Sequence, residues 1–258
     1  MNRHAYAFAA LFAVAAPSTY AAVPVMGDPL GPNGSDDFSN SAASAGKWTD
    51  SGGLGAGQLS IIDQHLSYTT NSLTMNSPDF AAWRWESNRT PDHTNWTFQI
   101  DVSVPQLSLT GSQYVLYGLQ MSTAVGTFFF YDYETPGGSQ FVAQRSPTDF
   151  VTATAAPGIA ALRFRYDGAT GDVLADYDSN GPTGGYEWTN VTSLAGLGNG
   201  TISVFGQSFS TTVSAADNVF GDNIRAVPEP ATCALMLAGL GLIGYAARRG
   251  QIRTVLCA

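Results

Sequence analysis

The sequence is poor in the residue types on which much site chemistry depends. Its 258 residues include two cysteines and three histidines, and both cysteines, Cys233 and Cys257, lie near the C-terminus. Residues 23–226 therefore cannot form an internal disulfide, a thiolate metal site or a catalytic cysteine centre. They also lack the Gly-x-Ser-x-Gly and His-Glu-x-x-His patterns, which argues against a serine hydrolase of that type and a zinc protease.

Charged side chains are scarce as well, at 12% of the chain against about 25% in an average globular protein. The charge that is present is mostly negative, with nineteen acidic and seven basic side chains in residues 23–226. Such a surface repels phosphate groups, so a nucleic-acid partner is not expected. The 28 glycines, the 13 prolines and a hydrophobic fraction of 44% indicate a folded, turn-rich β protein.

The N-terminus has the three parts of a secretory signal peptide. A short basic region, 1–4, precedes the apolar run 5–16, and small residues up to Ala22 supply the cleavage site. The alternative is a buried N-terminal helix, but the apolar run is too short to span a membrane and ends at a small-residue site. We expect residues 1–22 to be removed on export and residues 23–226 to fold outside the cytoplasm.

A second apolar segment lies near the C-terminus. Residues 231–247 carry no charge and are followed at once by Arg248 and Arg249. As a helix they would cover about 26 Å, enough for a thin bilayer. The arginine pair would stay in the cytoplasm, which leaves the preceding domain outside and agrees with the signal peptide.

The tripeptide Pro228-Glu229-Pro230 stands directly before this apolar segment. The tripeptide, the apolar run and the arginine pair together resemble the PEP-CTERM sorting signal of Gram-negative bacteria, over residues 227–250. The resemblance implies that an exosortase, a membrane cysteine protease, recognises the tripeptide as its substrate. It also implies transient anchoring in the inner membrane, followed by passage to the cell surface or the extracellular polysaccharide.

The chain departs from this pattern at its end. Sorting signals of this kind usually stop soon after the basic cluster, whereas residues 251–258 extend the chain here. We expect this extension to be a short cytoplasmic tail. An ordinary membrane anchor that is never processed is the alternative reading of residues 227–250.

Strict alternation of apolar and polar residues recurs between the two ends. Phe98, Ile100, Val102 and Val104 would share one face of a strand, with polar residues on the other. Similar runs bounded by turn residues are 58–63, 80–86, 113–121, 126–134, 139–145, 162–167, 172–178, 202–204 and 219–226. About ten strands without helical periodicity predict an all-β fold, an antiparallel two-sheet sandwich.

Three sequence pieces carry a second resemblance. Residues 35–38, 162–181 and 220–224 together resemble concanavalin A-like jelly rolls, of the kind often found before PEP-CTERM tails. The resemblance implies a jelly-roll β-sandwich for residues 23–226. It concerns the fold and does not assign an activity.

One loop matches a calcium-binding sequence motif. Asp176, Asp178, Asn180, Gly181 and Glu187 match D-x-D-x-N-G-x5-E, a spacing that brings side-chain oxygens onto a hard cation. Strand patterns instead of helices flank the loop, and a proline follows the glycine, so an EF-hand is not expected. The alternative is a strand-connecting turn, in which Asp, Asn and Gly serve local hydrogen bonds and positive φ.

Aromatic side chains beside polar groups indicate a possible glycan site. Trp83 and Trp85 share one face of a strand, and Asp132 and Tyr133 lie in a second aromatic-rich strand. Sugars are bound by aromatic platforms with a few well-placed polar groups. Core packing is the alternative for each of these aromatics, because such side chains dominate sandwich cores.

A carboxylate pair raises the question of hydrolysis. Some jelly rolls that cleave β-glucans use Glu-x-Asp-x-Glu along one strand, and here Asp132 and Glu134 would share a face at roughly 7 Å. Phe130 stands where the first acid would be. The constellation is thus incomplete, and we expect no enzymatic activity.

These patterns together predict an exported, exosortase-sorted protein of the cell surface or extracellular matrix. Its domain is expected to be non-catalytic and to bind an extracellular polysaccharide, with calcium as a candidate cofactor. Two alternatives stay open at this point: a jelly-roll glycosidase that uses Asp132 and Glu134, and a purely structural surface protein without a ligand.

Overall fold

The computed structural model of the protein describes residues 35–71, 76–85, 95–146, 148–197 and 200–228. The predicted signal peptide and the predicted membrane helix lie outside these residues. Within the described part of the chain, no helix is both long and apolar enough to cross a membrane.

Fifteen strands and two short helices make up the regular structure of the described residues. The strands form two sheets, and the described strand pairs are antiparallel. The helices are α2 (Ser41–Ala45) and the 3-10 turn η1 (Ala215–Asp217). The predicted all-β antiparallel sandwich is confirmed. The sequence predicted about ten strands, fewer than the structure has, because edge strands such as β2 and β10 have no clear alternation of apolar and polar residues.

The first sheet has seven strands. Their spatial order is β10 (Asp149–Thr154), β9 (Gly138–Ser146), β8 (Gly126–Thr135), β7 (Tyr114–Thr123), β14 (Gly200–Phe209), β5 (Pro78–Trp85) and β2 (Trp48–Leu54).

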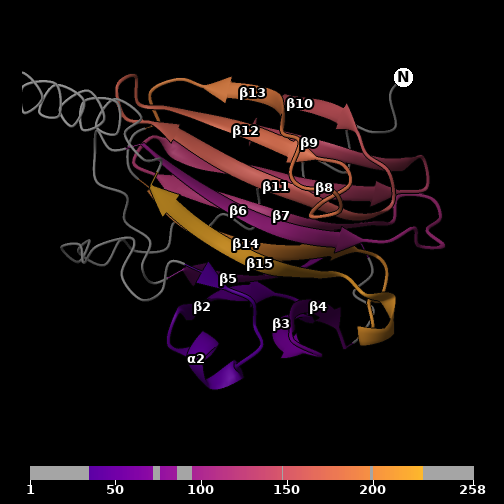
Figure 1. Ribbon diagram of the computed structural model, residues 1–258. Helices are drawn as coiled ribbons and strands as arrows, with labels where there is room; N and C mark the ends of the chain where they lie inside the picture. Colours follow the sequence, from indigo (N-terminus) through magenta and orange to yellow (C-terminus); the bar gives the residue numbers. More distant parts are fainter. Residues whose placement is uncertain (1–34, 72–75, 86–94, 147, 198–199, 229–258) are drawn as a thin grey trace, which may run out of the picture. The chain divides into compact units, whose positions relative to one another are not determined.

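The second sheet has eight strands. Their order is β13 (Thr189–Leu194), β12 (Asp172–Asp178), β11 (Gly158–Asp167), β6 (Trp96–Val104), β15 (Phe220–Pro228), β4 (His65–Thr70) and β3 (Gly57–Ile62), with β1 (Ser35–Asp36) beside β15. The succession from β13 to β15 can be followed from top to bottom in Figure 1.

The core lies between the two sheets and follows the predicted alternation. Phe98, Ile100, Val102 and Val104 of β6 are at most 2% exposed and belong to one apolar cluster that takes residues from both sheets. Burial of large apolar side chains contributes about 1.5–3 kcal/mol each, so these alternating positions dominate the stability of the sandwich.

Asp36 joins the start of the described chain to the edge of the seven-stranded sheet. Its carboxylate accepts hydrogen bonds from Trp48 Nε1 at 2.8 Å, from Ser44 Oγ at 2.8 Å and from the Phe38 amide at 3.1 Å. Lys47 Nζ lies 3.5 Å from the same carboxylate. The side chain is buried, so these donors supply the partners that water cannot.

We predict that Asp36→Ala lowers the free energy of unfolding by about 3 kcal/mol, because it leaves the Trp48 and Ser44 donors buried without an acceptor. Urea denaturation followed by tryptophan fluorescence measures the change. The neighbouring Asp37→Ala is the control, since Asp37 is exposed and is expected to change the midpoint little. Equal midpoints for the two variants would contradict the role assigned to Asp36.

Candidate functional site

Apolar side chains occupy both faces of the seven-stranded sheet. Along β7, Val115 and Tyr117 point into the core, whereas Tyr114 and Leu116 alternate with them and belong to a separate cluster. We call this cluster the outer aromatic cluster. Its members are Phe80, Ala82, Tyr114, Leu116, Phe129, Tyr131, Tyr133, Val142, Phe205 and Phe209.

Tyr131 and Phe205 form the middle of the outer aromatic cluster. Their ring centroids are 5.9 Å apart and the planes meet at 83°, an edge-to-face contact that aromatic rings prefer. Between them, on β7, lies Gly118, whose Cα pairs with both residues. A Cβ atom at Gly118 would lie 2.5 Å from the Tyr131 Cα, so only glycine lets the three strands approach this closely.

Two glutamine side chains add polar groups to this apolar face. Tyr131 Oη donates to Gln144 Oε1 at 2.7 Å, and Gln207 Nε2 donates to Tyr114 Oη. Burial raises the pKa of both phenols, which therefore keep their protons at neutral pH. The face thus combines aromatic rings with neutral hydroxyl and amide groups.

The structure does not bring the four predicted ligand residues to one surface. Tyr133 belongs to the outer aromatic cluster. Trp85 is 1% exposed and packs edge-on against Trp48 in the core, and Trp83 packs against the same core. Asp132 also points inward, since it alternates with Tyr133 along β8. Of the four, only Tyr133 lies on the outer face.

Asp132 and Glu134 share a face, as the spacing predicted, but it is the inner face of the sheet. Asp132 is fully buried, and neither of its carboxylate oxygens has a hydrogen-bond partner among the described residues. Glu134 is 2% exposed and accepts a hydrogen bond from Ser139 Oγ. Burial, together with the nearby Glu134, raises the pKa of Asp132 well above its usual range. A sugar on the outer face would be separated from both groups by the sheet itself.

The first carboxylate of the predicted calcium loop is engaged with cations of the neighbouring strand. Asp176 accepts from Arg163 Nη2 at 2.7 Å, from Arg165 Nε at 3.3 Å and from Asn190 Nδ2 at 2.8 Å. The side chain is 1% exposed, so this ion pair lies in a largely dehydrated position.

The other residues of that loop make turn contacts. Asp178 accepts from the backbone amides of Asn180 at 3.1 Å and Glu187 at 2.6 Å, and Asn180 Nδ2 donates to the Thr183 carbonyl. In the part of the chain that the structure describes, no three His, Cys, Asp or Glu side chains are grouped to hold a metal. Calcium binding by this loop stays a prediction.

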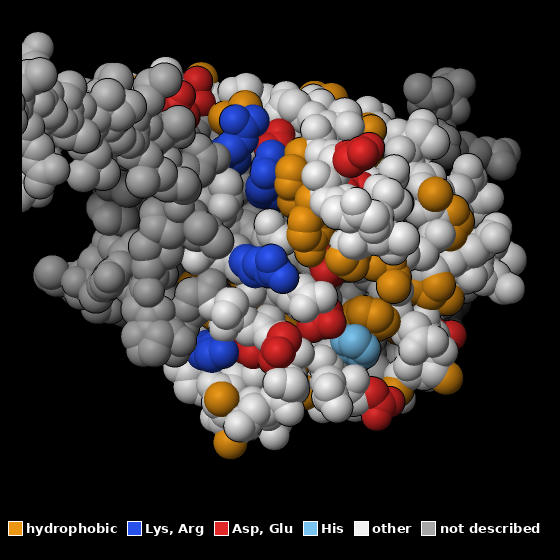
Figure 2. Space-filling model, viewed as in Figure 1, with side chains coloured by type: hydrophobic (Ala, Val, Ile, Leu, Met, Phe, Trp, Pro, Cys, Tyr) orange, Lys and Arg blue, Asp and Glu red, His pale blue; other side chains and the backbone are white. Residues whose placement is uncertain are grey.

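The segment after this turn is fixed to the outer face of the eight-stranded sheet. Tyr186 and Trp188 stack with ring centroids 5.2 Å apart, and the Arg163 guanidinium lies 4.2 Å from the Trp188 ring centroid. Tyr186 Oη donates to Asp101 at 3.0 Å. Figure 2 shows Lys and Arg side chains gathered on the face viewed there. Sequence patterns do not reveal these contacts, because Arg163 and Asp101 belong to neighbouring strands, β11 and β6, that are far apart in the sequence.

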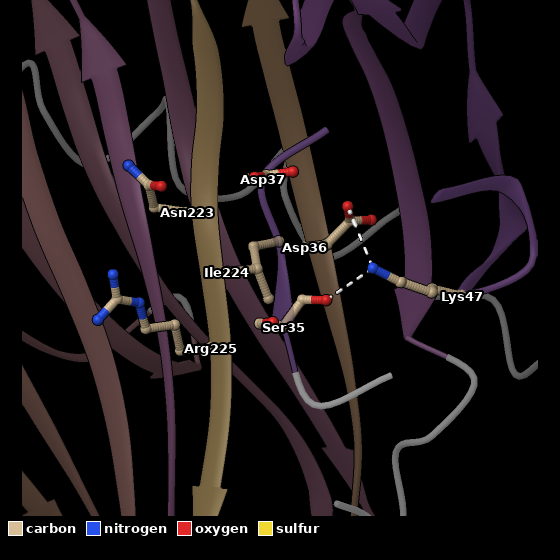
Figure 3. Close-up of a pocket in the computed structure, with 7 residues that line it drawn as sticks. All are labelled: Ser35, Asp36, Asp37, Lys47, Asn223, Ile224 and Arg225. Atoms are coloured by element: carbon tan, nitrogen blue, oxygen red, sulfur yellow. Dashed lines mark hydrogen bonds and ion pairs between the residues drawn. The ribbon is translucent and has the colours of Figure 1, made fainter. Parts of the chain in front are cut away.

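A small polar pocket lies where β1 meets β15 (Figure 3), with a volume of about 220 Å³. Lys47 Nζ donates to the Ser35 carbonyl at 2.7 Å and pairs with Asp36. The residues that line it are Ser35, Asp36, Asp37, Lys47, Asn223, Ile224 and Arg225. Lys47 already contacts the Ser35 carbonyl and the Asp36 carboxylate. We therefore assign the pocket to the hydrogen-bond network of Asp36 and not to a ligand.

The predicted sorting motif begins at the end of a central strand. β15 ends at Pro228, so the first residue of the Pro-Glu-Pro tripeptide is also the last residue of this strand. Glu229, Pro230, Arg248 and Arg249 lie outside the described residues.

Comparison with known protein families finds a PEP-CTERM protein-sorting motif at residues 226–250. The match confirms the sorting signal expected from the sequence. No curated protein matches the chain.

Solved structures similar to the chain include several lectin domains. The Emp47p carbohydrate recognition domain is 10% identical, with a TM-score of 0.47 over 77% of this chain and 96% of that one. Lectin II from Ulex europaeus is 10% identical, with a TM-score of 0.42 over 70% and 93%. The exoplasmic/lumenal domain of VIP36, in a Ca²⁺/Man3GlcNAc-bound form, is 14% identical, with a TM-score of 0.44 over 77% and 91%. These are likenesses of fold alone.

We predict that Asp132 makes the stability of the domain fall as the pH rises above about 4. An unfolded Asp has a pKa near 3.9, whereas burial raises the pKa of Asp132 in the folded state. Below about pH 4 the carboxyl is protonated in both states. Above that pH the unfolded state loses its proton first, which favours unfolding and lowers the stability. Each unit of pKa shift corresponds to about 1.4 kcal/mol. In Asp132→Asn the fall in melting temperature between pH 4 and pH 7 should become shallower.

The matched control is Asp149→Asn at an exposed position of β10. It should retain the pH slope of the unaltered protein. If Asp132→Asn and Asp149→Asn have the same slope, Asp132 is not a buried, protonated acid.

Proposed function

We propose that the protein is exported, processed at its sorting motif and displayed at the cell surface or in the extracellular matrix, where its domain binds a polysaccharide without cleaving it. The observation that carries the binding proposal is the outer aromatic cluster. An antiparallel sheet commonly packs one face on the core and leaves the other polar. Here the face that points away from the core is apolar and aromatic, which is the usual lining of a ligand site.

The chemistry of this face fits a sugar chain. The partly buried rings of Phe80, Tyr133 and Phe209 offer apolar surfaces to the C–H faces of sugar rings. The phenol of Tyr114 and the amides of Gln144 and Gln207 offer donors and acceptors to sugar hydroxyl groups. Carbohydrate and small-ligand sites combine mostly apolar walls with a few polar groups in this way.

The same face supports a binding role without hydrolysis. Asp132 and Glu134 lie on the inner face, where they cannot act as the acid and base on a sugar bound outside.

The sorting motif supports the destination. It implies processing by an exosortase, with the chain held in the inner membrane until Pro228, Glu229 and Pro230 have been recognised. The last described strand, β15, ends at Pro228, so we propose that processing releases the complete sandwich. Calcium at Asp176, Asp178, Asn180 and Glu187 remains a subsidiary proposal, which chelation during the binding assay would test.

We predict that residues 23–227, which contain all of the described strands except the last residue of β15, bind at least one member of a panel of neutral and acidic bacterial polysaccharides. Tyr133→Ala and Gln144→Ala should each weaken binding by about 3- to 10-fold, because each removes a ring or an amide from the face. Affinity electrophoresis or isothermal titration calorimetry measures the change.

Val125→Ala is the control, since Val125 is 60% exposed and lies in the turn between β7 and β8, outside the cluster. It should bind as the unaltered protein does. Absence of binding across the panel would favour a structural surface protein without a ligand. Equal effects of all three substitutions would move the site away from this face.

A further inference from the structure

One edge of the seven-stranded sheet is open to a further strand. β10 pairs with β9 on one side and has no neighbour among the described strands on the other. Five of its six residues are exposed. Among them Phe150 is 40% and Val151 42% exposed, so this edge presents large apolar side chains to water.

The backbone of β10 directs alternate residues toward the open edge. Just after the strand, the Ala155 amide donates to the Ser139 carbonyl of β9 at 3.2 Å. In an antiparallel ladder the backbone groups of successive residues point to opposite sides, and the register with β9 is unbroken from Phe150 to Thr154. The amides and carbonyls of Phe150, Thr152 and Thr154 therefore point away from β9.

β10 lacks the features that usually keep an open edge strand from pairing. Soluble proteins protect such edges with lysine, proline or a bulge. β10 has neither lysine nor proline, and both its one charge, Asp149, and its register shift lie at its first residue. The opposite edge strand, β2, is protected by a bulge between Asp50 and Gly52, where Gly52 has a φ of 99°. Of these two edges, β10 is the one open to pairing.

We infer that β10 pairs with β10 of a second copy of the chain, so that two seven-stranded sheets join edge to edge. An edge strand is complementary to itself when a twofold axis sets two copies antiparallel. The register that joins the outward backbone groups places Thr152 opposite Thr152 of the second copy and Phe150 opposite Thr154 of the second copy. The two Asp149 side chains then lie at opposite ends of the contact, so like charges do not meet.

The adjacent edge of the other sheet also favours a second copy. β13, the edge strand of the eight-stranded sheet, lies beside β10 (Figure 1). Its six residues carry no charge. The two edge strands on this side therefore hold a single charged side chain, whereas the whole chain has a formal net charge of −9. Two copies can meet here without bringing rows of like charges together.

The pairing has a consequence for the proposed polysaccharide site. Phe150 and Thr152 lie opposite Gln144 and Val142, which belong to the face of the outer aromatic cluster. The dimer would thus carry two such clusters on one continuous sheet face, and a long polysaccharide that contacts both would be held by avidity. This consequence rests on the proposed function, whereas the pairing itself does not.

The contact between two six-residue edges is small. It is expected to bury less than the roughly 800 Å² per partner of a standard stable interface. We therefore expect a weak dimer, with a Kd on the order of 10–100 μM.

Sedimentation velocity of residues 23–227 tests the pairing over protein concentrations that bracket this Kd. Residues up to Val227 form one compact unit. The variant Thr152→Pro removes an outward amide and leaves the bonds to β9 in place, and Thr152→Lys sets two like charges opposite each other. The unaltered protein should approach the dimer mass, whereas both variants should stay monomeric. Val125→Lys makes the same charge change at a 60% exposed turn residue and should dimerise as the unaltered protein does.

Cross-linking gives a second readout that does not depend on a high affinity. Residues 23–227 contain no cysteine, so Thr152→Cys introduces one thiol per chain. Directly paired residues have their Cα atoms about 5.5 Å apart, within the range of a disulfide. With oxidised glutathione, Thr152→Cys should form a covalent dimer several-fold faster than the control Val125→Cys.

Two results would overturn the inference: a monomer at every concentration with equal cross-linking of the two cysteine variants, or association that Thr152→Pro and Thr152→Lys leave unchanged. Mass that keeps rising beyond a dimer would also contradict it, because a twofold contact closes after two copies. If Thr152→Pro lowers the melting temperature, Thr152→Lys and the cross-linking rates decide. No glycan is present in these measurements, so their failure is distinct from a failure of the polysaccharide proposal.

Discussion

The seven-stranded sheet has two apolar faces, and the domain has one other sheet with which to cover them. The face that carries Tyr117 and Phe130 packs against the eight-stranded sheet and forms the core. The opposite face carries Tyr131 and Phe205, and leaving such rings in water costs about 25 cal/mol per Å² of apolar area. The proposal of a polysaccharide site on that side follows from this aromatic, amide-bearing face.

Opposite the core, the two sheets use their outer faces differently. On the eight-stranded sheet, Arg163 forms an ion pair with Asp176 and lies over the ring of Trp188. On the seven-stranded sheet, the polar groups are neutral amides and phenols set among aromatic rings. The first arrangement fixes a long connection in place, whereas the second offers a surface with the chemistry of a binding face. The buried Asp36 carboxylate accepts a hydrogen bond from Trp48 and so stabilises the edge of the seven-stranded sheet.

The sequence was sufficient to predict the fold class and the sorting signal. It could not show which side chains of β8 point into the core and which point outward. β6 alternates cleanly, so its inward residues could be named in advance. β8 contains Phe128, Phe129, Phe130, Tyr131, Asp132 and Tyr133, and aromatic residues occupy both alternating sets. Only packing against the second sheet decides that Asp132 points inward and Tyr133 outward. The calcium motif also could not show the partners of Asp176. The arginines that bind its carboxylate belong to β11 and precede Asp176 by thirteen and eleven residues.

The claim that the outer aromatic cluster is the ligand face is tested most directly by a spectrum of the chain with ¹³C-labelled tyrosine rings, recorded while a bound polysaccharide is added. The account predicts that the resonances of Tyr114, Tyr131 and Tyr133 shift, and that those of Tyr117 in the core and Tyr186 on the opposite outer face do not. Shifts confined to Tyr186, with the cluster tyrosines unchanged, would contradict it and place the ligand on the eight-stranded sheet.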